Sequence, residues 1–153
     1  MVYKLHILVI LDSFITDFTI TSANVDDREG VWDLVSSYRQ ITLIGDKGYI
    51  GKKLAFELKS EKDINLIPVL RSNSKMQAPK AISQLIFKLR RRIETSASQL
   101  VQQLNIEKVM AKSYWGFVTR IKTKLLSYNL CYYINKIIGW DINISKIKKL
   151  VFG

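Results

Sequence analysis

The chain has 153 residues, enough for one ordinary domain, and its 48% hydrophobic and 24% charged residues exclude a disordered protein. Its formal net charge of +11 favours a polyanionic partner, most often nucleic acid and less often an anionic membrane, although solubility alone would also account for it. The one cysteine, Cys131, excludes a disulfide or a cysteine zinc site within the chain, and the apolar run at residues 7–11 is too short to span a membrane.

The first half of the sequence predicts strands that alternate with short helices. Apolar, β-rich runs predict a hairpin at residues 3–11 and 16–21, a third strand at 41–45 and a fourth at 65–70. The spacing of apolar residues predicts helices at 24–38, where acidic residues crowd the start, and at 51–59. This order is typical of an α/β fold in which a hairpin leads into strand–helix units.

The second half predicts a polar loop at residues 71–79, two long helices at 80–104 and 113–138, and a basic tail at 140–153. The first of these helices should bury one apolar face, made of Ile82, Leu85, Ile86, Leu89, Ile93, Ala97, Leu100 and Leu104. We therefore expect one domain over residues 1–139, followed by the tail.

A glycine-rich turn carries the first candidate for chemistry. Gly45, Gly48 and Gly51 let the backbone reverse after the third predicted strand, and Asp46 lies at the tip of that strand. Open α/β sheets place their chemistry beyond the carboxyl ends of such strands, so Asp46 is a candidate metal ligand. The alternative is that Asp46 only caps the following turn or helix.

Glu94 is the second candidate, because it follows Arg90, Arg91 and Arg92 on a mainly apolar helix. We expect Glu94 at the rim of the core, with Arg90 and Arg91 on its side of the helix. It is either a partner in a surface ion pair or a metal-binding carboxylate whose neighbouring arginines meet phosphates. A two-metal site needs a third carboxylate, and the remaining candidates are Asp12, Asp17, Asp26, Asp27 and Asp33.

Several separate motifs follow one another in a consistent order. They are Tyr3-Lys4-Leu5-His6, Ala23-Asn24-Val25-Asp26-Asp27-Arg28-Glu29, Gly45-Asp46-Lys47-Gly48-Tyr49, Arg90-Arg91-Arg92-Ile93-Glu94-Thr95, Ser98-Gln99-Leu100, Ala111-Lys112-Ser113 and Tyr128-Asn129-Leu130. In order and spacing they resemble the catalytic domain of bacterial insertion-sequence transposases of the DDE class, and most closely the subgroup of insertion sequence nine-eight-two.

The resemblance implies a ribonuclease-H-like fold, a mixed sheet flanked by helices, with three catalytic acids. By motif, Asp46 corresponds to the second Asp and Glu94 to the Glu. The first Asp of the family lies on a central strand upstream of Tyr3, so the resemblance implies a partial domain that is marginally stable or associates, and that cuts DNA negligibly alone. In that fold Asp12 and Asp17 lie at the wrong end of the sheet. Asp26 and Asp27 lie at the correct end and could assist the metal site, but they stand at a helix start and are expected to cap it.

The resemblance also implies partners and cofactors. The family cuts and joins DNA during transposition with two Mg²⁺ or Mn²⁺ ions, so we expect element terminal repeats and target DNA as substrates, in the bacterial cytoplasm at the nucleoid. A homo-oligomer or an assembly with full-length transposase is a further expectation, and a membrane partner is not expected. The candidate DNA contacts are Lys75, Arg90, Arg91, Arg92, Lys112 and Arg120. The alternatives are a non-catalytic DNA-binding or assembly module, or a decayed pseudogene product.

The sequence favours structural roles for some of the remaining residues. His6, the only histidine, lies on a predicted buried strand and is expected in the core or behind the site residues, rather than as a catalytic group. Tyr114, Trp115 and Phe117 would suit base stacking, but their helical spacing favours the core. The subgroup has bulky apolar residues where this chain has Ser96 and Ala97, which would fit a decaying copy.

Overall fold

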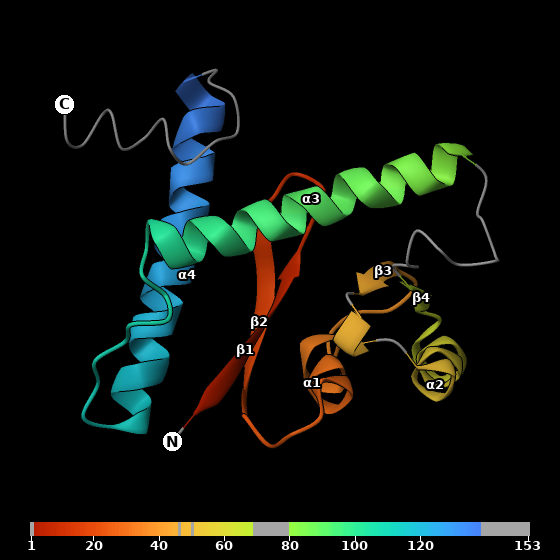
Figure 1. Ribbon diagram of the computed structural model, residues 1–153, viewed down its shortest axis with the longest axis horizontal. Coiled ribbons are helices and arrows are strands. Elements are labelled where there is room, and N and C mark those ends of the chain that lie inside the picture. The colour runs from red at the N-terminus through yellow and green to blue at the C-terminus, as the bar shows by residue number, and fades with distance from the viewer. Residues whose placement is uncertain (1, 46, 50, 69–79, 139–153) are drawn as a thin grey trace. The chain divides into compact units, whose positions relative to one another are not determined.

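The computed structural model describes residues 2–45, 47–49, 51–68 and 80–138 (Figure 1). The chain forms two compact units: the first combines Met1–Leu8 with Thr16–Arg91, and the second combines Val9–Ile15 with Arg92–Gly153. The predicted loop at 71–79 and the predicted tail at 140–153 lie outside the described residues.

The predicted hairpin is confirmed. Strands β1 (Tyr3–Val9) and β2 (Ile15–Ser22) are hydrogen-bonded neighbours. Backbone bonds from Ile10 N to Phe14 O and from Ala23 N to Val2 O close the two ends, which makes the pair antiparallel. β1 ends two residues earlier than predicted because residues 10–13 form the turn, where Ser13 has a φ of 67°.

Helix α1 (Asp27–Leu34) begins where its capping residues place it. The Asp26 carboxylate accepts a hydrogen bond from Arg28 N, and Asp27 and Glu29 lie in the first turn, where the helix dipole favours negative charge. The cap expected of Asp26 is therefore confirmed. The helix is shorter than the predicted 24–38, since Val35 already leaves the helical conformation.

A strand–helix–strand unit completes the first part of the fold. Strand β3 (Thr42–Gly45) leads into the single 3₁₀ turn η1 (Lys47–Tyr49), helix α2 (Lys52–Lys62) and strand β4 (Asn65–Pro68). β3 and β4 pair in parallel, with Thr42 opposite Asn65 and Ile44 opposite Ile67. α2 packs against β4 and α1 packs against η1 (Figure 1).

The core of the first unit lies among these elements. Its buried members are Val31, Val35, Leu54, Leu58 and Ile64. Partly buried side chains that pack against them are Trp32, Tyr38, Ile41, Leu43, Tyr49 and Leu66. Tyr49, from the turn after β3, is thus anchored by its ring in this core.

The second unit contains helix α4 (Tyr114–Ile138) and the carboxyl-terminal part of helix α3 (Lys80–Gln102). Its core is built from Leu100, Ile106, Ile121, Leu125, Tyr128 and Tyr132. The Tyr128 hydroxyl donates to Ser96 Oγ at 2.7 Å and the Tyr132 hydroxyl donates to Gln99 Oε1 at 2.8 Å, so buried tyrosines tie α4 to α3.

The apolar face predicted for α3 is wrong in part. Leu100 is buried, but Leu85 is 55% exposed and Ala97 is exposed. Ser96 and Gln99 are buried in their place, because the tyrosine hydroxyls of α4 offer them hydrogen-bond partners.

The α/β class is confirmed. Among the described strands, β1–β2 and β3–β4 form two separate two-stranded sheets, and no pairing joins them. A ribonuclease-H-like arrangement therefore stays a prediction.

Candidate active site

The glycine-rich turn connects β3 to α2, as predicted. β3 ends at Gly45 and η1 begins at Lys47, while Asp46 lies outside the described residues. A side chain at Gly45 would place its Cβ 3.1 Å from Tyr49 Cβ, which shows how tightly the backbone reverses there. The described residues of the candidate site are therefore those that flank Asp46 in the sequence and the side chains that contact them.

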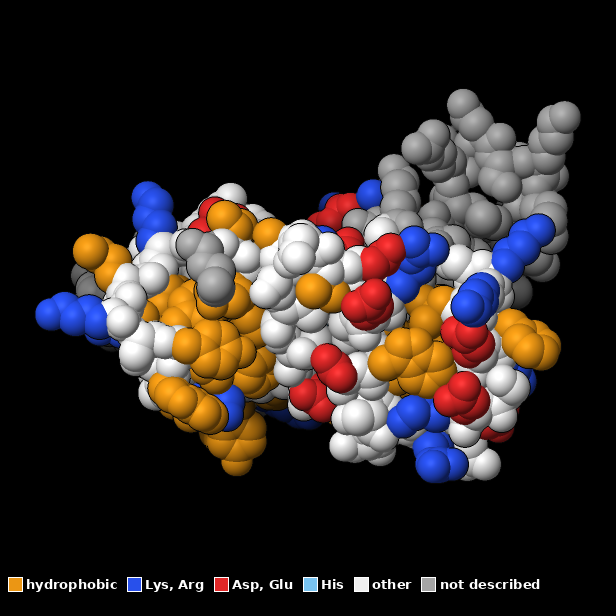
Figure 2. All heavy atoms as spheres, turned by 90° about the horizontal axis from the view of Figure 1, so that it is seen from below, with side chains coloured by type: hydrophobic (Ala, Val, Ile, Leu, Met, Phe, Trp, Pro, Cys, Tyr) orange, Lys and Arg blue, Asp and Glu red, His pale blue; other side chains and the backbone are white. Residues whose placement is uncertain are grey.

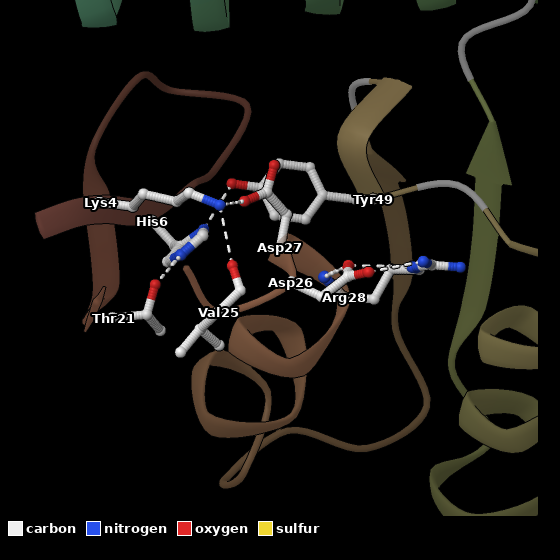
Figure 3. Close-up of polar contacts among 8 residues, drawn as sticks. All are labelled: Lys4, His6, Thr21, Val25, Asp26, Asp27, Arg28 and Tyr49. Carbon is white, nitrogen blue, oxygen red and sulfur yellow. Dashed lines mark hydrogen bonds and ion pairs between the residues drawn. The ribbon is translucent and has the colours of Figure 1, made fainter. Parts of the chain in front are cut away.

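A buried histidine contacts Tyr49, the last residue of this turn (Figure 3). His6, on β1, is 2% exposed. Its Nδ1 lies 2.7 Å from the Tyr49 hydroxyl and its Nε2 lies 2.8 Å from Thr21 Oγ1 on β2. Each hydroxyl can donate or accept, so a neutral imidazole satisfies both contacts with its single N–H. Burial lowers the pKa of His6, with the charge of Lys4 acting in the same direction and that of Asp27 opposing it. The expected burial of His6 is confirmed.

An ion pair lies beside the histidine. Lys4 Nζ is 2.9 Å from Asp27 Oδ1 and 2.8 Å from the Val25 carbonyl oxygen (Figure 3). The other carboxylate oxygen faces the turn: a Cβ at Gly48 would lie 2.6 Å from Asp27 Oδ2. Only glycine fits this position without a shift, because Lys4 restrains the carboxylate that would have to move.

Asp26 has a different partner. The Arg28 guanidinium donates to both Asp26 carboxylate oxygens, and Arg28 N donates to Oδ1. These hydrogen bonds lower the pKa of Asp26 well below its ordinary value. Adjacent aspartates therefore do separate tasks: Asp26 caps α1, and Asp27 faces the turn.

Glu94 lies on α3 and is exposed, so its predicted position at the rim of the core is wrong. The reason is the orientation of the helix, which turns Ser96, Gln99 and Leu100 inward. Glu94 belongs to the second unit, whereas the turn that carries Asp46 belongs to the first.

The small residue Ser96 has a structural explanation. It is 1% exposed and accepts the Tyr128 hydrogen bond. A bulky apolar side chain at residue 96 would leave that buried hydroxyl without its acceptor. Ser96 therefore matches its neighbour on α4 and gives no support to the idea of a decaying copy. Asn129 of the Tyr-Asn-Leu motif is structural too, because its side-chain amide bonds to both Ile15 N and Ile15 O.

The predicted DNA contacts are distributed over both units. Arg90 is half-buried, and Arg91 lies with its guanidinium carbon 6.0 Å from the centre of the Phe87 ring. Arg92 donates to the Leu11 carbonyl oxygen, a contact within the second unit. Lys112 and Arg120 are exposed, and Lys75 lies outside the described residues.

Two aromatic side chains beside these cations are exposed, so their predicted burial is wrong. Trp115 is 78% exposed and Tyr114 is 51% exposed, at the start of α4, where Lys112 precedes them. Phe117 is half-buried.

The donor chemistry of Asp46 and Glu94 fits a divalent cation, since carboxylate oxygens are the ligands that Mg²⁺ prefers. Within the described ranges, no three His, Cys, Asp or Glu side chains gather closely enough to hold a metal. Most of the further carboxylate candidates contact other groups: Asp12 pairs with Lys136 at 3.9 Å, Asp17 accepts from Phe18 N, and Asp26 and Asp27 bind Arg28 and Lys4.

Sequence reasoning missed the roles of Lys4, Thr21 and the Tyr49 hydroxyl. One signal was present, because Lys4 and His6 are two apart on a strand and so share a face. The partners on that face come from other elements, and strand periodicity does not identify them.

None of the described helices is both long enough and apolar enough to span a membrane. In comparisons with known proteins, no curated protein and no solved structure matches the chain. The model of one family, the transposase DDE domain, matches residues 1–114. This region covers most of the chain and includes the hairpin, the glycine-rich turn and Glu94, and the protein therefore belongs to the transposase DDE domain family.

Proposed function

We propose that this chain is part of a DNA transposase of the insertion sequence nine-eight-two type, with Asp46 and Glu94 as two of its catalytic, metal-binding acids. The observation that carries the proposal is the family match over residues 1–114, a range that contains both Asp46 and Glu94. The proposal includes a ribonuclease-H-like fold.

In the proposed reaction, Asp46 and Glu94 would hold divalent cations, Mg²⁺ or Mn²⁺. Bound cations supply positive charge at the phosphate and make a water or a 3′ hydroxyl a stronger nucleophile. The carboxylates orient this charge for strand cleavage and strand transfer. Two carboxylates are few for two ions, so we expect the 153-residue chain alone to cut DNA negligibly.

The distribution of charge supports DNA as the substrate. Residues 1–63 carry ten acidic and eight basic side chains, whereas residues 64–153 carry three acidic and sixteen basic side chains. Figure 2 shows the consequence for α1 and α2, where red and blue side chains are interspersed over the surface. We propose that phosphates contact the later, basic part of the chain, through Lys75, Arg90, Arg91, Arg92, Lys112 and Arg120.

Trp115 and Tyr114 extend this proposal. Both are exposed next to Lys112, and their rings suit stacking on unpaired bases at a DNA end. We further propose that the protein acts at terminal repeats and target DNA in the nucleoid, as a homo-oligomer or together with full-length transposase.

The DNA proposal is tested by fluorescence anisotropy with a labelled 30-base-pair duplex over a range of salt concentrations. We expect binding to weaken steeply with salt, and Lys112→Ala and Arg120→Ala each to reduce the slope of log K against log salt by about one. Lys53→Ala is the matched control, because Lys53 is 90% exposed on α2 and should leave the slope unchanged. Binding that does not depend on salt would contradict the proposal.

The alternative function is a non-catalytic DNA-binding or assembly module. It is favoured because, among the described residues, no three His, Cys, Asp or Glu side chains gather closely enough to hold a metal. DNA binding with no specific Mn²⁺ binding would support this alternative over the enzyme.

A further inference from the structure

We infer that His6, Asp27 and Tyr49 are positioning residues that hold the turn bearing Asp46 in place for metal binding. The inference rests on the proposed function and extends it, because it assigns a role to residues outside the acid motif. His6 acts through Tyr49, and Asp27 acts through its close approach to Gly48.

The turn that follows Asp46 is contacted from two other elements. Tyr49 and Gly48 both belong to η1, which follows Asp46 directly. The Tyr49 hydroxyl is held from β1 by His6 Nδ1, and Gly48 lies against the Asp27 carboxylate of α1. Two elements thus restrain the turn beside the proposed ligand.

The rings of His6 and Tyr49 are closely restrained by their neighbours. A Cβ at Gly30 of α1 would lie 3.0 Å from both Cδ2 and Nε2 of His6, so the ring fits closely against that helix. The opposite ring nitrogen is held by Thr21. The Tyr49 ring packs on the hydrophobic core of the first unit and meets the His6 ring edge-on, with centroids 5.7 Å apart.

The Asp27 carboxylate that faces Gly48 is also restrained. Asp27 is restrained by Lys4, whose ammonium group also binds the Val25 carbonyl oxygen just before α1. Lys4 and Asp27 side chains are 37% and 34% exposed, so the pair lies at the edge of the buried network and beside the turn. Figure 3 shows Lys4, His6, Asp27 and Tyr49 converging from β1, α1 and η1.

Loss of a positioning side chain should weaken metal binding. Side chains that orient a ligand from behind typically change metal affinity by about 10- to 100-fold when they are removed. Removing the Tyr49 hydroxyl deletes one contact and keeps the ring in the core. We therefore expect Tyr49→Phe to weaken Mn²⁺ binding about tenfold without unfolding the protein.

The experiment is a Mn²⁺ titration of the full 153-residue chain, followed by electron paramagnetic resonance of the free ion. Asp46→Asn should abolish the specific site, and Tyr49→Phe and His6→Gln should each weaken it about tenfold. Tyr133→Phe is the matched control, since Tyr133 is 55% exposed on α4, and it should bind Mn²⁺ as the unaltered chain does. Thermal unfolding of each variant verifies that it folds.

A second measurement needs no variant. His6 is the only histidine, so its imidazole NMR signals are assigned without mutagenesis. Mn²⁺ bound at Asp46 should broaden these signals. Unchanged His6 signals at saturating Mn²⁺ would overturn the inference. Because this measurement uses the unaltered chain, it remains decisive even if Tyr49→Phe does not fold.

The outcomes separate the inference from the proposed function. If Asp46→Asn loses Mn²⁺ binding and both Tyr49→Phe and His6→Gln keep it, the positioning role is wrong and the metal site stands. If Asp46→Asn binds Mn²⁺ normally, the proposed metal site is wrong and the positioning role falls with it.

Discussion

Each unit contains a buried polar network, and the two networks differ in chemistry and in what they hold. In the first unit, His6 and Asp27 contact the turn that carries Asp46, and Lys4 pairs with Asp27. In the second, neutral groups connect two long helices through Tyr128–Ser96 and Tyr132–Gln99. Both satisfy their buried polar atoms, so burial and hydrogen bonding alone do not identify a site. The charged network contacts the turn that carries the proposed metal ligand Asp46 and is the functional candidate, and the neutral one supports the fold.

The largest effect is expected from the structural network. Tyr128→Ala removes a fully buried ring and its hydrogen bond to Ser96, and should lower the free energy of unfolding by about 3–5 kcal/mol. Urea unfolding followed by circular dichroism measures the change. Tyr133→Ala, at an exposed position of the same helix, should cost less than about 1 kcal/mol. Equal losses for the two variants would contradict the described packing of α4.

An intermediate effect is expected where the first network meets the turn. Gly48→Ala places a methyl group 2.6 Å from Asp27 Oδ2, and the required shift should cost about 1–3 kcal/mol and weaken Mn²⁺ binding. Gly51→Ala is the control, because its nearest neighbours lie at 3.5 Å or more. A Gly48→Ala variant as stable as the unaltered chain would show that Asp27 does not restrain the turn.

The smallest effect is expected from pH. Burial lowers the pKa of His6 in the folded chain from its ordinary 6.5, so the unfolded chain takes up the proton first as the pH falls. The free energy of unfolding should be constant above pH 6.5 and should decrease below it, over a range above about pH 5.5 where carboxylates do not titrate. Groups that face the ring are Lys4, Thr21, Asp27 and Tyr49. In His6→Gln this slope should vanish, and a slope that persists would assign it to another group.

Much of the fold could be predicted from sequence because its signals are local. The Asp26 cap, the acidic first turn of α1, the β3 run and the glycine turn all act within a few residues. The exposure of Glu94 and Trp115 could not be predicted in this way, because the buried face of a helix depends on its partner. On α3, tyrosines from α4 made Ser96 and Gln99 the inward residues, although apolar periodicity favoured Ala97.

Only the motif residues of the candidate site stand out in the sequence, and their metal-binding role stays a prediction. Asp46 and Glu94 stand in motifs, so sequence alone singled them out. The Lys4–Asp27 pair and the His6–Tyr49 contact join residues 23 and 43 apart, and such pairs depend on tertiary structure.

The most direct test of the account is a double-mutant cycle in Mn²⁺ affinity with Asp46→Asn, Glu94→Gln and the combined variant. If the two carboxylates share one metal site, each single substitution should weaken binding by at least about tenfold, and the double substitution should add little more. If Glu94→Gln leaves Mn²⁺ affinity unchanged while Asp46→Asn lowers it, or if neither matters, the two acids do not form a common site and the account is wrong.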